Sequence, residues 1–352
     1  MKIISPYGKD VLDELQRVYH LNSVEDLVTT IHDHLAKHYF IESCEILSVH
    51  VAFGLTLNIL ASGNIYYLKF ASRTMNRTPK DLFLYIDFLY RNAIPVPKIF
   101  KTTDGSWFKS VLNDTDYDVV YLMSSSPGEP ILAPSPSRIQ EYAAVMARYH
   151  KLGLNYEPKV LGGQPTTFTI EQAIASDLPK FYHALCGREK LFSAREIDLI
   201  NFIINYICTT FALAQPLQLL RTHIHGDFRL CHVFYTGETV SGIIDIDQST
   251  YAERLIDVCY GLISSPNPAG GIFFSIEQIQ LFLSSYNQEF PFTASERKLL
   301  KPMLLYALIE QLDEVSKCYE TGNSDTTITD IELTHKALAK IFDIQEAKLI
   351  ST

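Results

Sequence analysis

Two short segments of the sequence combine carboxylates and imidazoles with strongly apolar neighbours. Residues 223–232 read HIHGDFRLCH, and residues 241–247 read SGIIDID. In each segment a carboxylate follows a run that is typical of a β-strand, so a hairpin would bring Asp227 and Asp245 together. Two carboxylates at close range raise one another's pKa unless a cation or a shared proton lies between them. The pairing therefore predicts a metal site, a general base, or both.

The elements that must position these carboxylates lie in a mostly helical half of the chain. Within that half, residues 222–235 and 240–246 are predicted to form two short strand-and-loop units. Apolar residues recur at helical spacing on both sides of them. The predicted helices are 136–152, 170–185, 193–214, 276–290, 295–320 and 328–349.

The other half of the chain changes from helical to strand spacing. Ser23 is a plausible helix cap, residues 62–64 (Ser-Gly-Asn) favour a hairpin turn, and residues 94–97 (Ile-Pro-Val-Pro) end a helix. A small antiparallel sheet with a helix or two is therefore expected. The predicted elements are helices over 1–40 and 80–92, and strands within 45–70, over 107–112 and over 117–123.

The segment 124–130 (SSSPGEP) is the best candidate for a linker, because Pro and Gly interrupt both strands and helices. It predicts an N-terminal part over 1–123 and a C-terminal part over 131–352. The fold class is therefore α+β, with the sheet in the first part and most helices in the second.

Composition excludes some classes of function. The 352 residues include 30 Lys and Arg against 40 Asp and Glu, a net charge of -10, so the basic surface of a nucleic-acid-binding protein is not expected. The N-terminus carries no apolar signal-peptide run, and 199–214 is shorter than the roughly 20 apolar residues of a membrane span. That stretch is predicted to be a buried helix. No membrane association is therefore expected, and six widely spaced cysteines indicate a reduced, cytoplasmic protein.

The two motifs together resemble those of the aminoglycoside phosphotransferase and choline kinase-like family, a branch of the protein-kinase fold. Its signature is HGDxxxxN followed by an apolar strand and IDF or IDW. Further matches occur in the family's order between about residues 45 and 262. The resemblance implies a two-lobed fold with a small antiparallel-sheet lobe and a helical lobe. The matching segments are 66–69 (YYLK), 94–97 (IPVP), 121–128 (YLMSSSPG), 147–152 (ARYHKL) and 254–257 (RLID).

The resemblance also implies roles for three residues. Asp227 would orient the acceptor hydroxyl and accept its proton, Asp245 would bind Mg²⁺, and Lys69 would hold the α- and β-phosphates of a nucleotide. Phosphoryl transfer requires positioning and charge neutralisation more than covalent help, which suits this set. The structural alternatives are a loop-capping Asp227, an Asp245 in a strand-end turn and a solvated Lys69.

His232 departs from the usual family pattern. Most members have Asn there, whose amide oxygen binds a second Mg²⁺, whereas macrolide phosphotransferases resemble this chain in having His (HGDLHPGH). Imidazole nitrogen is a softer ligand that suits Mg²⁺ less well. We assign His232 to the metal site, and the alternative is a histidine packed in the core. His225 is expected to organise the backbone of the loop.

The nucleotide site is less distinct in the sequence. By resemblance, Gly54 belongs to the nucleotide loop and Met123 to the hinge that faces a purine, although an ordinary turn and an ordinary linker explain both residues. ATP and GTP remain equal alternatives. The helix predicted over 80–92 lacks the glutamate that pairs with the phosphate lysine. Asp81 and Asp87 are its only acidic residues, and solvated helix charges are expected there.

Three acidic residues near the C-terminus are candidates for binding the acceptor. Glu310, Asp313 and Glu314 follow helical spacing and so lie on one face of a helix. They would neutralise a cationic acceptor such as an amino sugar or another amine-bearing antibiotic. The alternative is a solvated helix face.

The sequence thus predicts a small-molecule kinase that transfers the γ-phosphate of ATP or GTP to a hydroxyl of an amine-bearing antibiotic or metabolite. One alternative is a housekeeping kinase of the choline or homoserine type. Another is a catalytically weak, nucleotide-binding pseudokinase, which His232 and the missing glutamate favour and which Asp227 and Asp245 oppose.

Overall fold

The computed structural model describes residues 2–4, 22–51, 55–71, 79–109, 119–131, 134–157, 170–214, 219–263, 274–322, 326–345 and 349. The chain divides into two compact units. Unit 1 comprises Met1–Ser126 with Leu161–Gln164, and unit 2 comprises Pro127–Val160 with Pro165–Thr352. The division between Ser126 and Pro127 falls inside the segment 124–130.

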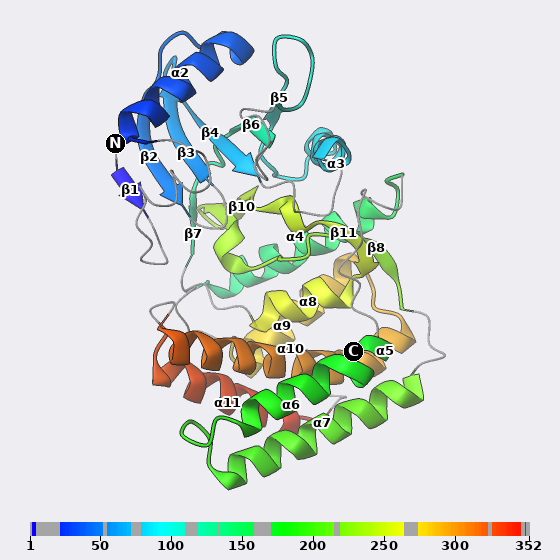
Figure 1. Cartoon of the computed structure of the whole chain (residues 1–352). Helices are drawn as coiled ribbons and strands as arrows, with labels where there is room; N and C mark the ends of the chain where they lie inside the picture. Colours follow the sequence, from blue (N-terminus) through cyan, green and yellow to red (C-terminus); the bar gives the residue numbers. More distant parts are fainter. Residues whose placement is uncertain are drawn as a thin grey trace. The chain divides into compact units, whose positions relative to one another are not determined.

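Unit 1 is built on one six-stranded sheet (Figure 1). Its neighbouring strands are antiparallel, except that β1 runs parallel to β2. The antiparallel sheet predicted for this part of the chain is confirmed. In sheet order the strands are β1 (Lys2–Ile4), β2 (Glu45–Val51), β3 (Leu55–Ala61), β4 (Asn64–Ala71), β6 (Val119–Ser124) and β5 (Ile99–Phe100).

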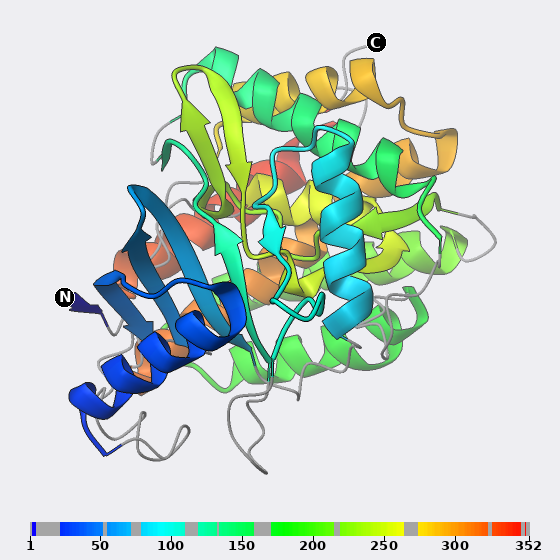
Figure 2. The same cartoon turned by 90° about the horizontal axis from the view of Figure 1, so that it is seen from above.

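The helix predicted over residues 1–40 is shorter than expected. Lys2–Ile4 is a strand, because its backbone groups pair with the edge of the sheet, and residues 5–21 lie outside the described residues. The helix in this region is α2 (Val24–Tyr39), and Ser23 caps it by accepting the Asp26 N–H. Figure 2 shows α2 alongside the strands of unit 1.

Alternating burial on β3 explains how the sheet of unit 1 packs. Leu55, Leu57, Ile59 and Ala61 are buried, and the residues between them are only partly buried. Leu55, Leu57 and Ile59 share one core with Leu27, Ile31 and Leu35 of α2. Ser62 and Gly63 turn the chain into β4 with positive φ angles of 51° and 76°, as a tight hairpin requires. The second helix of this unit is α3 (Pro79–Arg91).

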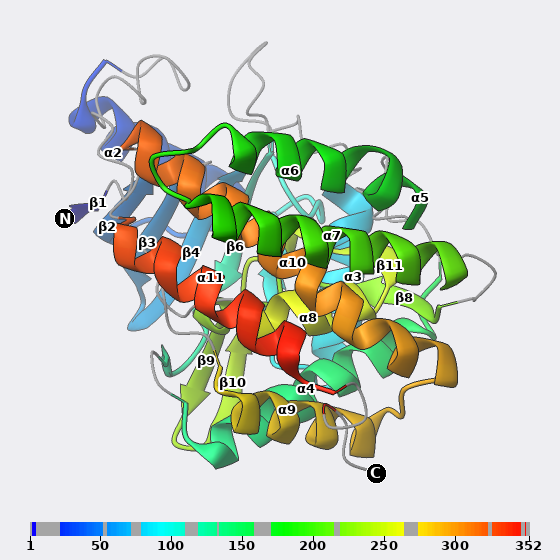
Figure 3. The same ribbon diagram turned by 90° about the horizontal axis from the view of Figure 1, so that it is seen from below.

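Unit 2 is mostly helical, as predicted. The long helix α10 packs against α6, α7, α8 and α11, and α4 packs against α9 (Figure 3). The helices are α4 (Pro136–Gly153), α5 (Ile170–Gln172), the π-helical turn η1 (Ala173–Asp177), α6 (Leu178–Cys186), α7 (Ala194–Ala214), α8 (Leu255–Ile263), α9 (Ile276–Glu289), α10 (Ala294–Thr321) and α11 (Ile328–Asp343).

Four features of unit 2 differ from the sequence prediction. Helix α8 was not predicted, because it is buried on nearly every side and therefore lacks an amphipathic pattern. Helix α11 ends at Asp343 rather than 349, and the π-helical turn interrupts the helix predicted over 170–185. Glu129–Pro130 in the predicted linker forms the short strand β7, which pairs with β9 (Val233–Thr236).

Helix α7 is the only helix of the described residues that is long and apolar enough to cross a membrane. One third (33%) of its most apolar window is buried. The sequence predicted a buried helix, but only one face is covered: Phe202 is 62% exposed and Leu213 is 78% exposed on the other side. Length and composition alone are weak evidence for a membrane span, since helices at the core of globular proteins meet the same criteria.

Two small sheets lie among the helices of unit 2. Strand β8 (Arg221–Ile224) pairs with β11 (Thr250–Glu253), and β9 forms a hairpin with β10 (Thr239–Ile243). The loop between β8 and β9 carries the HGD motif, and residues 244–249 follow β10. The hairpin thus positions both motifs. All six cysteines are free, as predicted.

Candidate active site

Three of the predicted site residues meet in unit 2. One ligand atom from each of Asp227, His232 and Asp245 lies within 4.8 Å of the others, a grouping that suits a metal ion. Asp227 and His232 come from the loop between β8 and β9, and Asp245 follows β10. The β9–β10 hairpin brings them together, as the spacing of the two motifs predicted.

The Asp227 carboxylate has a cation on one side. Arg229 Nε forms an ion pair with Asp227 Oδ1. The other oxygen, Oδ2, lies 3.5 Å from His232 Nδ1, and the side chain is 17% exposed. Sequence reasoning did not single out Arg229, although its place two residues after the HGD aspartate was a usable signal. The carboxylate is thus held in place while still reached by solvent.

Hydrogen bonding fixes the orientation of the His232 ring. Its Nδ1–H donates to the main-chain oxygen of Asp227 at 2.9 Å, and Nε2 lies 3.6 Å from Asp245 Oδ2. Burial lowers the pKa of His232, but interactions with Cys231, Asp245 and Asp227 outweigh burial and raise the pKa to about 9. The site therefore attracts positive charge, whether this is a proton on the ring or a metal ion.

Asp245 adopts an unusual backbone conformation. Its φ of 61° and ψ of 44° lie in the left-handed region, which non-glycine residues seldom adopt. Such strain persists where the surrounding structure holds it, and it is concentrated at functional sites. The Asp245 side chain is 43% exposed, which leaves room for further ligands.

His225 connects the HGD loop to the end of β10. Its Nε2–H donates to Ile244 O at 2.9 Å, and its Nδ1 accepts the Asp227 N–H at 3.2 Å. Burial lowers the pKa of His225, so the ring is neutral and both nitrogens are occupied by backbone groups. Gly226 has a φ of +82°, and a Cβ there would lie 2.4 Å from Gln248 O. The loop geometry thus requires both residues.

A buried carboxylate in α8 holds the same loop from the other side. Asp257 accepts the N–H groups of His225 at 2.6 Å and Gly226 at 2.8 Å. His150 Nε2 lies 3.0 Å from Asp257, and His150 Nδ1 lies 2.7 Å from the Tyr286 hydroxyl. The sequence matches at 147–152 and 254–257 pointed to these residues without giving them a role. Asp257 is a positioning residue.

The predicted nucleotide residues lie in unit 1. Lys69 is partly buried on β4, and Met123 is partly buried near the end of β6. Gly54 lies outside the described residues. In α3, Asp87 forms an ion pair with Arg91 at 2.8 Å, which agrees with a surface role for this carboxylate.

The three acidic residues predicted to bind the acceptor have different environments. Asp313 forms an ion pair with Arg188 at 2.5 Å, and Arg188 also pairs with Glu320 at 2.8 Å. Glu314 is exposed. Glu310 is partly buried, and its Oε2 has no hydrogen-bond partner. The charge of Asp313 is thus compensated within the protein, and Glu310 is the better candidate.

A second carboxylate, that of Asp177, acts on Glu310, and sequence reasoning missed it. It lies at the end of the π-helical turn η1 and accepts a hydrogen bond from the Tyr306 hydroxyl at 3.2 Å. Burial, followed by the charges of Asp177 and Glu314, raises the pKa of Glu310 to about 7. A π-helical turn often marks a functional site, but no residue pattern in the sequence predicted this turn.

Residues 66–289 match the model of a phosphotransferase enzyme family. The chain belongs to this family. The matched region contains both motifs, and the resemblance inferred from them is confirmed, as is the prediction of a phosphotransferase. This region also includes Lys69, which the family resemblance placed on the phosphates.

Known proteins are similar to this phosphotransferase at low identity. A homoserine kinase of Rhodopseudomonas palustris (strain BisB18) is 26% identical over 227 residues, which cover 61% of this chain and 60% of that kinase. A solved amicoumacin kinase has a TM-score of 0.59 at 14% identity and covers 94% of this chain and 98% of its own. A microcompartment-associated aminopropanol kinase has a TM-score of 0.64 at 14% identity, with coverages of 89% and 95%. The structural likenesses show the fold, and they confirm the predicted two-lobed, kinase-like class.

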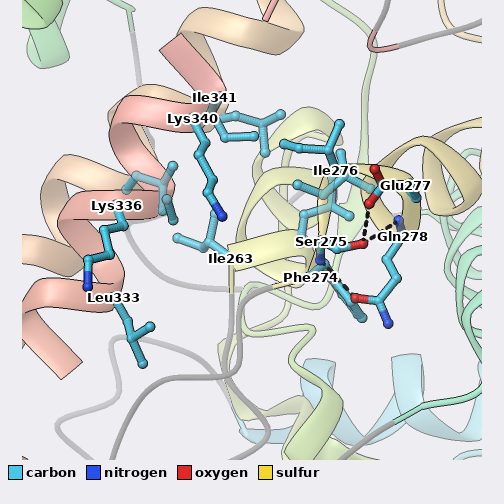
Figure 4. Close-up of a pocket in the computed structure, with 15 residues that line it drawn as sticks. Ile263, Phe274, Ser275, Ile276, Glu277, Gln278, Leu333, Lys336, Lys340 and Ile341 are labelled. Atoms are coloured by element: carbon cyan, nitrogen blue, oxygen red, sulfur yellow. Dashed lines mark hydrogen bonds between the residues drawn. The ribbon is translucent and has the colours of Figure 1, made fainter. Parts of the chain in front are cut away.

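The phosphotransferase also contains a pocket of about 470 Å³ between α8, α9, α10 and α11 (Figure 4). Its lining is mainly aliphatic, with Lys336, Lys340 and Glu277 as the charged members. The lining includes none of the predicted site residues, so the pocket is separate from the group formed by Asp227, His232 and Asp245.

Proposed function

We propose that this phosphotransferase transfers the γ-phosphate of ATP or GTP to a hydroxyl of an amine-bearing small molecule. The observation that carries the proposal is the meeting of Asp227, His232 and Asp245 within 4.8 Å. The group supplies a proton acceptor and metal-binding atoms side by side, which phosphoryl transfer needs. In this proposal 1–123 is the nucleotide-binding lobe, 124–130 the hinge and 131–352 the catalytic and acceptor lobe. The site of action would be the cytoplasm.

The proposed reaction assigns the proton to Asp227. The acceptor oxygen bonds to the γ-phosphorus while its proton passes to the Asp227 carboxylate, and the bond from the γ-phosphorus to the bridging oxygen breaks to release the nucleoside diphosphate. Arg229 holds Asp227 Oδ1, and Oδ2, which lies 3.5 Å from His232 Nδ1, is the oxygen proposed to accept the proton. Neutral His225 fixes the loop and takes no proton.

The nucleotide is assigned to residues of both motifs and of unit 1. The carboxylate of Asp245 and the Nε2 atom of His232 are suitable ligands for a divalent ion, which the sequence predicts to be Mg²⁺. Such an ion would neutralise charge on the phosphates. Lys69 is proposed to contact the α- and β-phosphates, and Gly54 and Met123 to contact the nucleotide.

The acceptor is proposed to be cationic because Glu310 and Asp177 combine two carboxylates with an unpartnered oxygen. An ammonium group there would supply the missing partner. Glu314 is exposed on the same helix and is a secondary candidate, whereas Asp313 is already paired with Arg188.

A mass-spectrometric screen tests the function directly. The protein, Mg²⁺ and either ATP or GTP are incubated with aminoglycosides, macrolides, peptide antibiotics and amino alcohols, and products are searched for a gain of one phosphate. An amine-bearing product is expected with wild type and not with Asp227→Asn. Nucleotide-dependent thermal stabilisation without transfer to any acceptor would instead support a pseudokinase.

A housekeeping kinase of the choline or homoserine type is the second candidate. The 26% identity to a homoserine kinase favours it. The same screen separates the two candidates, because a housekeeping enzyme would phosphorylate a small amino alcohol or homoserine in preference to every antibiotic.

A further inference from the structure

The candidate metal-binding atoms of His232 and Asp245 are a nitrogen and a carboxylate oxygen, whereas Mg²⁺ prefers oxygen ligands alone. We propose that the divalent ion bound between His232 and Asp245 is Mn²⁺ in preference to Mg²⁺. The inference rests on the proposed function in one respect, that this ion serves the nucleotide site. It concerns which metal the site selects.

The geometry makes Nε2 the metal-binding atom of His232. Its Nδ1–H is committed to the main-chain oxygen of Asp227 at 2.9 Å. A ligating histidine commonly donates its other N–H to a carbonyl or carboxylate in this way, which fixes the ring and directs the lone pair at the metal. Nε2 lies 3.6 Å from Asp245 Oδ2, close enough for both atoms to bind one ion at metal–ligand distances of about 2.1 Å.

The mixed nitrogen and oxygen donors favour a transition ion over Mg²⁺. Mg²⁺ prefers oxygen ligands, and imidazole nitrogen binds first-row transition ions better. Mn²⁺ also accepts carboxylate, phosphate and water oxygens as ligands. The Asp245 side chain is 43% exposed, which leaves room for such ligands beside it.

Metal binding in the presence of ADP tests the preference at one fixed pH. Free Mn²⁺ is followed by electron paramagnetic resonance, and Mg²⁺ affinity is obtained by competition. We expect the ratio of the Mg²⁺ Kd to the Mn²⁺ Kd to fall about tenfold or more in His232→Asn, since that variant offers an amide oxygen. We also expect electron spin echo modulation from a ¹⁴N nucleus in wild type, and its loss in the variant.

Two further variants make the result decisive. Cys231→Ser should keep both the Kd ratio and the nitrogen signal. If Cys231→Ser loses them while His232→Asn leaves them unchanged, the selectivity belongs to the thiol and the proposal is overturned. His232→Gln supplies an amide oxygen on a longer side chain and should behave as His232→Asn does. Melting temperatures identify any variant that fails to fold.

The outcomes separate this inference from the proposed function. An equal metal ratio in wild type and both His232 variants overturns the metal assignment, even if the screen finds a phosphorylated product. A nitrogen signal that depends on His232, together with no transfer to any acceptor, keeps the metal assignment and overturns the kinase proposal.

Discussion

At the scale of single residues, the site depends on how each carboxylate is compensated. Asp227 has Arg229 and His232 beside it, whereas Glu310 lacks a hydrogen-bond partner for one oxygen. Asp313 is closest to Arg188 and is neutralised without a ligand. The same carboxylate group therefore has three roles, which its surroundings decide.

Asp227→Asn should lower turnover by about 10²-fold or more, because the amide keeps the shape of the side chain but accepts no proton. Nucleotide binding should survive, since the proposed phosphate contacts lie elsewhere. Single-turnover phosphate transfer and nucleotide titration measure the two effects. Turnover within a fewfold of wild type would show that Asp227 is not the proton acceptor.

The pKa of Glu310 predicts how acceptor binding depends on pH. A carboxyl whose pKa is raised to about 7 becomes ionised as the pH rises through 7. The KM of an amine-bearing acceptor should therefore fall between pH 6 and pH 8. In Glu310→Gln this dependence should flatten, and KM should stay high at both values.

The stability of the folded state supplies an independent measurement and a control for Glu310. The folded state disfavours ionised Glu310. Glu310 therefore destabilises the folded state increasingly as the pH rises from about 4.5 to about 7. Glu310→Gln should thus melt at a higher temperature than wild type at pH 8. As the control, Glu289→Gln, at the exposed end of α9, should leave KM and melting unchanged. A steep pH dependence that persists in Glu310→Gln would contradict the assignment.

At the scale of elements, the HGD loop is held between one hairpin and one helix. The hairpin presents Ile244 O to His225, and α8 presents Asp257 to two backbone N–H groups. The loop itself has little regular structure, so these contacts satisfy its backbone and define its shape.

Asp257→Asn should loosen the loop because a neutral amide accepts fewer and weaker hydrogen bonds than a carboxylate. Hydrogen exchange at the amides of His225 and Gly226 should become faster, and kcat should fall about 10-fold or more, since small displacements of Asp227 are costly. The acceptor KM should change little. Unchanged exchange at both amides would show that Asp257 does not position the loop.

At the scale of the whole molecule, the two units have separate cores of different kinds. Unit 1 packs a sheet against α2, and unit 2 packs helices around α10. Unit 2 also contains a fully buried ion pair, in which Nε and Nη2 of Arg254 each donate to one carboxylate oxygen of Glu296 at 2.7 Å. Nη1 of Arg254 donates to the main-chain oxygen of Phe290, and Nη2 also donates to that of Pro291.

Glu296→Gln should lower the free energy of unfolding of unit 2 by about 3–5 kcal/mol, because it leaves the buried Arg254 without its counter-charge. Glu332→Gln breaks the exposed pair with Lys336 and should cost less than about 1 kcal/mol. Native-state hydrogen exchange measures the change in the free energy of unfolding for each variant, separately in unit 1 and unit 2. Equal effects of the two variants, or equal loss of protection in unit 1, would contradict this account.

The sequence by itself determined the features that repeat at short range. Alternation on β3, the four-residue spacing of Leu27, Ile31 and Leu35, and the turn at Ser62 depend on local periodicity and backbone preference. The two motifs likewise predicted that Asp227 and Asp245 meet, because a short hairpin leaves few other arrangements.

Only the tertiary structure decided the features that join distant segments. Helix α8 is buried on nearly all sides and so leaves no periodic pattern, and Asp257 meets the HGD loop only after the chain has folded. Arg188 neutralises Asp313 across 125 residues, and Asp177 approaches Glu310 from a separate helix. Local preference cannot predict such pairs, because their free energy arises from burial and charge shared between elements that are remote in the chain.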